Sequence, residues 1–268
     1  MVFDTHLHTE ISSDSEMKIK DAINKAKDLN IGLIITEHMD LFYPEENKFI
    51  FDVNKYFQRY EQYRNDKLLL GIEVGMQIKC ADNIEKITEN NNFDFVIGSI
   101  HMVGGIDIYH PEYYQQAKED AYNKYFKAMY NCINAFTGID SLGHIDYIAR
   151  YATYEDNEMY YEYFQEGYDK LLKSLAQRDK ALEINTRRLA DPRAIAILLP
   201  VYKRFKQLGG KYVTIGSDAH KIGDIGANFA EADKIAQACG LRPVFFKQRK
   251  IEYIKKEYYR CDLTLQDI

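Results

Sequence analysis

The chain has 268 residues, 46% of them apolar and 28% charged, which predicts a folded globular protein with one large α/β domain or two small ones. Its net charge of -6 lacks the basic excess of a nucleic-acid binder, and no apolar run approaches membrane-spanning length, so we expect no nucleic-acid or membrane partner. It begins with Met1-Val2-Phe3 instead of a signal peptide, and its 4 scattered cysteines form no Cys-x-x-Cys pair, so we expect a cytoplasmic protein without a thiolate metal site or disulfide framework.

An early stretch begins as a strand whose end carries two histidines, His6 and His8. Residues i and i+2 of a strand project from one face, so both imidazoles should point the same way. Asp14 follows across a polar turn, and imidazole with carboxylate ligands suits a divalent transition metal. The turn has a second interpretation, because Ser13 and Glu16 match the Ser-x-x-Glu capping box, which would make it only the start of a helix.

Helical patterns alternate with short apolar runs along the rest of the chain. Helices are indicated by an apolar stripe at helical spacing or by capping residues, as at Asp52 and Asp191-Pro192. The predicted helices cover residues 17–30, 53–64, 84–92, 160–177 and 191–207, and a long one opens at Pro111 with Tyr114, Ala117, Ala121, Tyr125 and Met129 at helical spacing. Further strands are predicted over residues 31–36, 68–72, 93–100, 141–143, 180–184 and 212–216.

These elements favour a single domain over residues 1–268. Seven buried strands that alternate with helices, without an internal repeat or a Pro- or Ser-rich linker, predict one α/β barrel of the TIM-like kind. Val244-Phe245-Phe246 is suited to one additional strand. We expect the polar residues 247–268 to form a C-terminal extension that docks outside the barrel or frays.

Side chains that can bind metal ions follow six of the seven predicted strands. They are His6, His8, His38, Glu73, His101, His144, Asp218 and His220. The loops at the carboxyl ends of parallel barrel strands converge on one mouth, so these side chains should meet there. Only one of the 7 histidines lies elsewhere, and we expect this residue, His110, at the surface.

The size of this set bounds the number of metal ions. Together with Asp14 there are nine candidates, whereas one tetrahedral zinc ion needs about four ligands. The set suffices for two or three divalent ions with open positions, which indicates a multinuclear hydrolytic centre. Mixed histidine and carboxylate sites accept zinc, manganese and iron, so the pattern specifies neither the metal nor the oligomeric state.

The order of these motifs resembles the polymerase and histidinol phosphatase (PHP) superfamily over nearly the whole chain. Its His-x-His, Glu-His, Gly-x-Glu, Ser-x-His, Gly-His and Ser-Asp-x-His segments appear here in order. Longer segments resemble the histidinol-phosphate phosphatases within that superfamily, namely Gly71-Ile72-Glu73-Val74-Gly75, residues 96–101, residues 142–151 and residues 182–186.

The resemblance implies a distorted seven-stranded barrel with three metal ions. Residue by residue, it assigns His6, His8, Glu73 and Asp218 to the first ion, Glu73, His101 and His144 to the second, and Asp14, His38 and His220 to the third, with Glu73 as a bridge. The chain departs from the family at Asp14, where many relatives carry histidine. It departs again at Arg187-Arg188-Leu189-Ala190, where a small-residue turn is expected.

The leading hypothesis is hydrolysis of L-histidinol phosphate to L-histidinol and phosphate, a step of histidine synthesis that acts on a small phosphorylated substrate. The catalytic residues would be Glu73, Asp218 and Arg150. Asp218 could relay a proton from the attacking water or serve only as a ligand. Two other functions stay open, a PHP-type phosphodiesterase or nucleotidase acting on nucleotides or single-stranded nucleic acid, and a non-catalytic metal-binding module.

Arginines are the expected contacts to the substrate phosphate. Arg150 is the first choice because guanidinium binds phosphate oxygens bidentately, and the other interpretation of this residue is a surface salt bridge. Arg187, Arg188 and Ser99 are the further candidates for contacts to the substrate.

Overall fold

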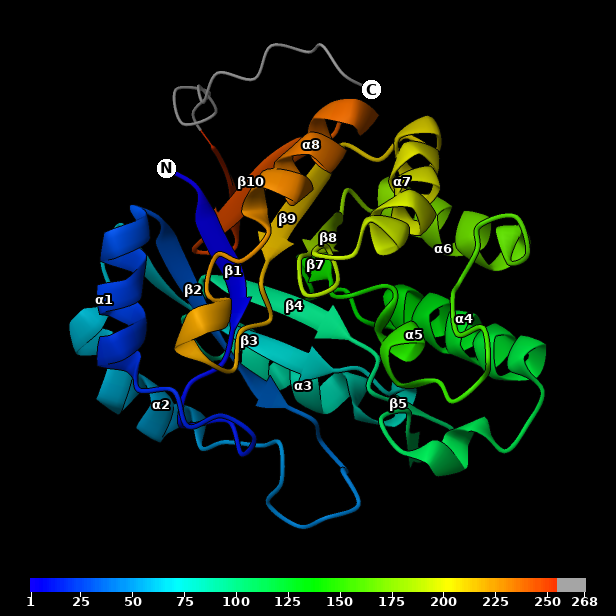
Figure 1. The fold of residues 1–268 in the computed structure, drawn as a ribbon. Coiled ribbons are helices and arrows are strands. Elements are labelled where there is room, and N and C mark those ends of the chain that lie inside the picture. The colour runs from blue at the N-terminus through cyan, green and yellow to red at the C-terminus, as the bar shows by residue number, and fades with distance from the viewer. Residues whose placement is uncertain (255–268) are drawn as a thin grey trace.

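The structure is a computed structural model that describes residues 1–254, and it is built around one large β-sheet (Figure 1). The strands are β1 (Phe3–Leu7), β2 (Gly32–Met39), β3 (Leu68–Gly75), β4 (Phe95–Ser99), β7 (Ser141–Leu142), β8 (Ala181–Asn185), β9 (Tyr212–Gly216), β10 (Arg242–Lys247) and β11 (Lys250–Tyr253). They follow one another in that order, and every neighbouring pair is parallel except β10 and β11. A separate antiparallel hairpin consists of β5 (Met102–Val103) and β6 (Ile106–Asp107).

Helices surround this sheet on its outer side (Figure 1). They are α1 (Ile19–Leu29), α2 (Val53–Tyr60), α3 (Ala81–Glu89), α4 (Lys118–Ala135), α5 (Tyr147–Tyr151), α6 (Gln165–Gln177), α7 (Pro192–Gln207) and α8 (Phe229–Cys239), with short 3₁₀ helices at Glu61–Tyr63, Ile78–Cys80, Pro111–Tyr114 and Ile222–Asp224. The larger apolar core lies between the helices and the sheet. Within residues 1–254, none of the helices has the length and apolar character that crossing a membrane requires.

The seven predicted parallel strands are all present, as β1, β2, β3, β4, β7, β8 and β9. The predicted start of α7 is confirmed, because the Asp191 side chain accepts a hydrogen bond from Arg193 N and Pro192 occupies the first turn. The side chain of Asp52 caps α2 in the same way. The apolar run at residues 244–246 belongs to β10, which pairs with β9 only through Arg242 and Pro243.

One predicted helix is wrong. Pro111 opens a short 3₁₀ helix that ends at Tyr114, and α4 begins separately at Lys118, after Ala117 has adopted an extended conformation. Tertiary contacts explain the break, because the Tyr114 hydroxyl donates to the carbonyl oxygens of Ile108 and Ile148. The regular apolar spacing across this region therefore combines two elements that pack independently. The predicted helix over residues 160–177 is also shorter, since α6 begins at Gln165.

Contacts join the first strand to the segment that follows β9 (Figure 1). Asp218 N donates to His6 O at 2.7 Å, and His8 N donates to Ala219 O at 2.9 Å. Leu7 and Ala219 form a parallel bridge. The ends of β1 and β9 are therefore held side by side, so side chains that follow them can share one site.

A second, smaller apolar cluster lies on the face of the sheet that turns away from the helices. It consists of Phe3, Ile34, Leu69, Phe95, Ile97, Ala181, Val244 and Phe246. Phe246 of β10 packs on Phe95 with ring centroids 5.4 Å apart, so the hairpin formed by β10 and β11 covers the amino-terminal part of this face. Ile34 and His38 project from the same side of β2, as Leu69 and Glu73 do from β3, which places the predicted ligands beyond this cluster. The expected C-terminal extension thus begins as β11, and residues 255–268 lie outside the described part of the chain.

Candidate metal centre

Glu73 occupies the middle of a buried cluster of histidines at the carboxyl ends of the strands. Its carboxylate oxygens lie 3.3 Å from His6 Nε2, 3.4 Å from His8 Nε2, 2.8 Å from His38 Nδ1, 3.3 Å from His101 Nε2 and 3.0 Å from His144 Nε2. The Glu73 side chain is completely buried. Histidines from four other strands or strand ends therefore converge on the carboxylate that β3 carries, as the parallel topology predicts.

Asp218 is a second carboxylate that faces the same Nε2 atoms of His6 and His8 as Glu73 does. Its Oδ1 atom is 3.7 Å from His6 Nε2, 3.6 Å from His8 Nε2 and 3.8 Å from His220 Nδ1. Its Oδ2 atom accepts a hydrogen bond of 2.7 Å from Arg150 Nη1. Asp218 has a φ of 55°, in the left-handed region that few residues other than glycine adopt, and such strain is concentrated at functional sites.

Asp14 lies at the open side of the cluster. Its Oδ2 atom is 3.0 Å from His220 Nε2 and 3.5 Å from His38 Nε2. The capping-box interpretation of its turn is wrong, because α1 begins only at Ile19 with Lys18 as the preceding residue, and the Ser13 hydroxyl accepts a hydrogen bond from Phe49 N instead. The structure thus brings all nine predicted ligands together. His110, as expected, is exposed.

Several atoms in the cluster are arranged to bind cations. Within the described residues, His6 Nε2 and His8 Nε2 are buried and have no hydrogen-bond partner. Buried polar atoms are normally paired, so unpaired ring nitrogens that face a carboxylate fit metal ions. Four groups of three residues could each hold an ion, because the ligand atoms within each group lie within 4.8 Å of one another. The groups are His8, His38 and His220; His6, Glu73 and His144; His6, His8 and Asp218; and His38, Asp40 and His101.

The ring nitrogens of three histidines that point away from Glu73, their Nδ1 atoms, contact other polar side chains. His6 Nδ1 donates to Glu183 Oε1 at 2.7 Å, and His101 Nδ1 donates to Asp40 Oδ1 at 2.7 Å. His8 Nδ1 lies 3.2 Å from the Ser12 hydroxyl, which itself donates to the buried carboxylate of Glu37. Such contacts orient metal-binding imidazoles.

The sequence interpretation missed these supporting carboxylates. Asp40 directly follows β2, and Glu183 stands between Leu182 and Ile184 in the apolar strand β8. A charged residue inside a buried strand is the signal that could have indicated Glu183, because such residues are rarely buried without a partner.

The charges in the cluster shift one another's titration. Burial alone would raise the pKa of Glu73, but the nearby His6, His101 and His38 lower it well below its usual range. Burial likewise opposes the charged form of His38, yet Glu73 and Asp14 raise the pKa of this imidazole to about 10. The pKa of His8 is lowered well below its usual range by burial and by the neighbouring His38 and His220. Without metal ions, the centre is therefore a mixture of protonated and neutral imidazoles around carboxylates.

The predicted substrate contacts divide into two kinds. The first kind lies beside Asp218. Arg150 of α5 is buried, and its Nε and Nη2 atoms have no partner among the described residues. Arg187 lies at the mouth, with Nη1 2.9 Å from Asp218 O. Arg188 is instead paired with Asp146 and Glu158, away from the histidines. The Ser99 hydroxyl is fully buried and donates to Glu73 Oε1 at 2.7 Å.

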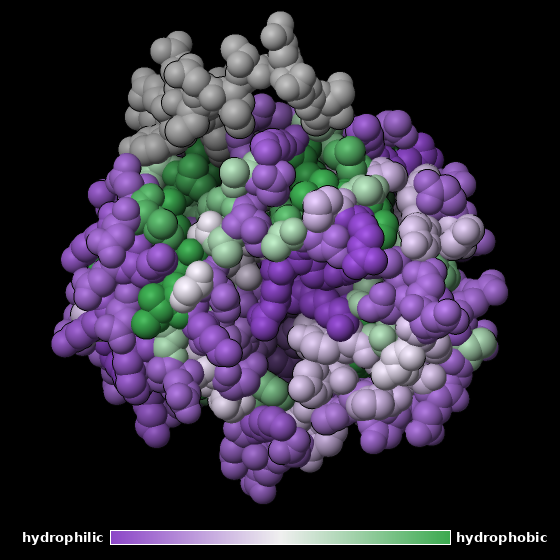
Figure 2. All heavy atoms as spheres, in the orientation of Figure 1, coloured by the Kyte–Doolittle hydropathy of each residue, from purple (hydrophilic) through white to green (hydrophobic). Residues whose placement is uncertain are grey.

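The molecular surface is open above this cluster. Figure 2 shows a hollow bordered by hydrophilic residues, in the region where β3 and β4 end in Figure 1.

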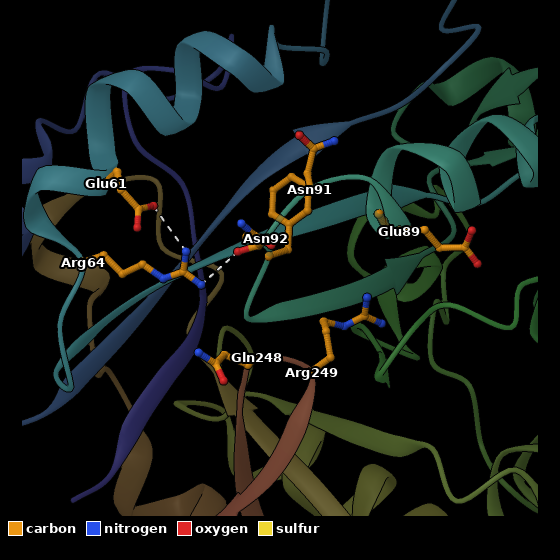
Figure 3. A pocket seen from close by; sticks show the side chains of 9 residues that line it. Glu61, Arg64, Glu89, Asn91, Asn92, Gln248 and Arg249 are labelled. Carbon is orange, nitrogen blue, oxygen red and sulfur yellow. Dashed lines mark hydrogen bonds and ion pairs between the residues drawn. The ribbon is translucent and has the colours of Figure 1, made fainter.

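A different cavity of about 600 Å³ lies near the amino ends of these strands, and none of the nine predicted ligands lines it (Figure 3). Its arginines are both paired, Arg64 with Glu61 and Asp94, and Arg249 with Asp140, so it offers no free cation to a phosphate.

Known proteins share both the sequence and the fold. Residues 4–187 match the PHP domain family. A protein of Clostridium acetobutylicum named probable histidinol-phosphatase is 47% identical over 254 residues, which are 94% of this chain and 100% of that relative. The histidinol-phosphatase of Lactococcus lactis is 34% identical over 225 residues, covering 81% of this chain and 83% of the relative.

Two solved structures are similar. The crystal structure of histidinol phosphate phosphatase from Lactococcus lactis, complexed with zinc, L-histidinol and phosphate, has a TM-score of 0.88 and 32% identity, covering 94% of this chain and 98% of that one. A chain in the structure of archaeal ribonuclease P with mature tRNA has a TM-score of 0.52 and 13% identity, a likeness of fold alone. With its converging histidines, its match to the PHP domain and relatives that align over most of its length, the chain belongs to the histidinol-phosphatase family of PHP-domain proteins.

Proposed function

We propose that the protein hydrolyses L-histidinol phosphate to L-histidinol and phosphate, as a metal-dependent phosphomonoesterase of histidine biosynthesis. The observation that carries this proposal is the meeting of five histidines at Glu73 beside the unpaired guanidinium atoms of Arg150. The relatives named histidinol-phosphatase, and the similar structure that holds zinc, histidinol and phosphate, support the choice of substrate.

The residues that hold metal ions are proposed from the family pattern and the geometry. His6, His8, Glu73 and Asp218 would hold one ion, Glu73, His101 and His144 a second, and Asp14, His38 and His220 a third. When bound, zinc, manganese or iron ions acidify water and offset charge on the phosphoryl oxygens. Glu73 would bridge two of these sites, a role that is supported by its two oxygens, since each faces an imidazole nitrogen.

Arg150 is proposed as the residue that binds the substrate phosphate. One of its nitrogens is fixed by Asp218, and the other two are buried without partners, so the guanidinium is oriented before substrate arrives. Arg187 is the second phosphate contact at the mouth. Arg188 and Ser99 were predicted to contact the substrate, but because their side chains already bond Asp146 and Glu73, we propose that they position these groups instead.

Asp218 is proposed as a metal ligand in preference to a proton relay. Burial would raise its pKa, but His6, His8 and Arg150 lower it well below its usual range. A general base works best when its pKa is near the working pH, so this carboxylate is poorly matched to that role.

Further expectations about the whole chain stay proposals. The contacts between β1 and the segment after β9 support a distorted seven-stranded barrel within one domain over residues 1–268. A cytoplasmic location, and the absence of a nucleic-acid partner, likewise remain predictions.

Phosphate release after separate reconstitution with zinc, manganese and iron tests the function. We expect histidinol phosphate to be hydrolysed far faster than nucleotides or single-stranded DNA. Faster hydrolysis of nucleotides or DNA would favour the nucleotidase or phosphodiesterase alternative. A fully loaded protein inactive on all of these substrates would favour the non-catalytic module.

A further inference from the structure

Glu183 is a buried carboxylate behind the metal centre that contacts two of the histidines at once. It lies in β8 with no exposed surface, and Tyr202 fixes its backbone by donating to Glu183 O at 2.8 Å. One carboxylate oxygen, Oε1, accepts from His6 Nδ1 at 2.7 Å. The other, Oε2, accepts from the backbone nitrogen of His144 at 2.6 Å and from Asn185 Nδ2 at 3.1 Å.

The contact to His6 determines which ring nitrogen is free. A carboxylate can only accept, so Nδ1 carries the proton that is shared with Glu183. Nε2 is then the nitrogen left to bind a metal ion, and it faces the centre, 3.3 Å from Glu73 and 3.7 Å from Asp218. Glu183 therefore holds His6 in the tautomer and orientation that metal binding through Nε2 needs.

The contact to His144 acts on the backbone. The strand before it, β7, has only two residues, so few ladder hydrogen bonds hold the chain where His144 leaves the sheet. The His144 ring packs beside Tyr147 but is not fixed by a hydrogen bond at Nδ1, which is buried without a partner among the described residues. The position of its Nε2 atom, 3.0 Å from Glu73, thus depends on the backbone that Glu183 holds.

The space for this arrangement comes from Gly216 of β9. A Cβ atom at this position would lie 2.4 Å from Glu183 Oε1 and 2.4 Å from the Cβ atom of His6. No side chain fits there unless Glu183 or His6 moves. The glycine, the carboxylate and the histidine therefore form one packed unit across three strands.

We propose that Glu183 is a positioning residue that couples two metal sites, by fixing the ring of His6 and the backbone of His144 together. This inference rests on the proposed function only in that both histidines are metal ligands. One carboxylate that serves both sites should make their metal occupancies fall together when it is changed. A merely structural carboxylate would lower stability without a selective effect on metal binding.

The test is zinc titration of the metal-free full-length protein, with Glu183→Gln as the main variant. The amide keeps the shape but has only one accepting atom, so either His6 Nδ1 or His144 N faces an NH₂ group. We expect zinc affinity to fall by about 10- to 100-fold, with both sites affected, and activity to recover in part in excess zinc. The melting temperature of metal-free Glu183→Gln should fall no further than that of the control variant Asp140→Asn.

Asp140→Asn is the matched control, because Asp140 is another buried carboxylate, which accepts from Val96 N and Arg249 far from the cluster. It should lower the melting temperature and leave zinc affinity unchanged. Gly216→Ala should reproduce the zinc defect of Glu183→Gln without altering any charge.

Two results would overturn the inference. Glu183→Gln could bind zinc like the unaltered protein, or its loss of zinc affinity could be matched by Asp140→Asn. The proposed function fails separately, if the unaltered, zinc-loaded protein does not release phosphate from histidinol phosphate.

Discussion

At the scale of single residues, Arg150 combines burial with incomplete pairing. A buried guanidinium normally satisfies all its donors, yet within residues 1–254 only Nη1 has a partner, the Asp218 carboxylate. The tyrosine ring of Tyr147 lies beside it, with the guanidinium carbon 5.5 Å from the ring centroid. Both contacts hold the guanidinium plane in place, so the two free donors point in a fixed direction.

Arg150→Lys should therefore lower kcat/KM even though the charge is kept. An ammonium group cannot replace two planar donors, and losing one hydrogen bond to a charged group costs about 1.5–3 kcal/mol, roughly 10- to 100-fold. Steady-state kinetics on histidinol phosphate with equal metal loading measure the effect. Equal efficiency of the lysine variant would instead identify Arg150 as a structural partner of Asp218.

Asp14 is the proposed ligand at which the sequence departs from the family pattern, and two substitutions test its role. Asp14→Asn removes the charge next to His38 and His220, so we expect metal content to fall toward two ions per chain and turnover to fall with it. Asp14→His should keep three ions and much of the activity, because imidazole is a sound ligand. Elemental analysis and phosphate release check both variants. An asparagine variant with full metal content and turnover would remove Asp14 from the site.

At the scale of elements, the strands were predictable because a strand buried on both faces appears as a short apolar run that ends in polar residues. The bounds of β9 and α7 agree with the sequence prediction, since glycines and an Asp-Pro cap delimit them. The hairpin of β10 and β11 was predictable only as one added strand. Its packing on Phe95 joins residues far apart in the chain, and local patterns contain no information about such contacts.

The same limit applies to the candidate site. The clustering of its nine candidate ligands was predictable because their residue types recur at strand ends. The contact of Glu183 with His6 and His144 was not, because it depends on the alignment of neighbouring strands and on the space above Gly216.

The β10–β11 hairpin should contribute to stability without contributing to metal binding. Phe246 is 4% exposed, so Phe246→Ala should lower the free energy of unfolding by about 3–5 kcal/mol through the cavity it leaves. Zinc content after refolding should be unchanged. Tyr163→Ala, at a side chain that is 76% exposed, is the control and should alter little in thermal unfolding. A Phe246 variant as stable as the control would show that the hairpin is dispensable.

At the scale of the whole molecule, an acidic protein with a net charge of -6 has to bind an anionic substrate. Protons and metal ions compete for its buried imidazoles. The carboxylates Glu73 and Asp14 raise the pKa of His38 to about 10 against the effect of burial, and the pKa values of His6 and His101 are raised as well. These rings are therefore protonated in the metal-free protein at neutral pH, and zinc must displace those protons.

Zinc binding should accordingly release protons, and zinc affinity should increase as the pH rises toward the His38 pKa of about 10. Calorimetric titrations in two buffers of different ionisation enthalpy, at about pH 6.5 and about pH 7.5, measure the number released. We expect more than one proton per chain. Identical heats in both buffers would show that the ligands are already neutral.

The apolar cluster beneath the centre has a consequence for the order of events in turnover. Because Phe3, Phe95, Phe246 and their neighbours fill the amino-terminal part of the face, the described residues 1–254 leave the hollow at the carboxyl ends of the strands as the way into the site (Figure 2). If Arg150 binds the phosphate as proposed, the phosphate must enter first, and the histidinol end then lies nearer the solvent. Histidinol therefore leaves first and phosphate last, so inorganic phosphate should inhibit in competition with substrate, whereas histidinol should not, as initial-rate inhibition patterns will show.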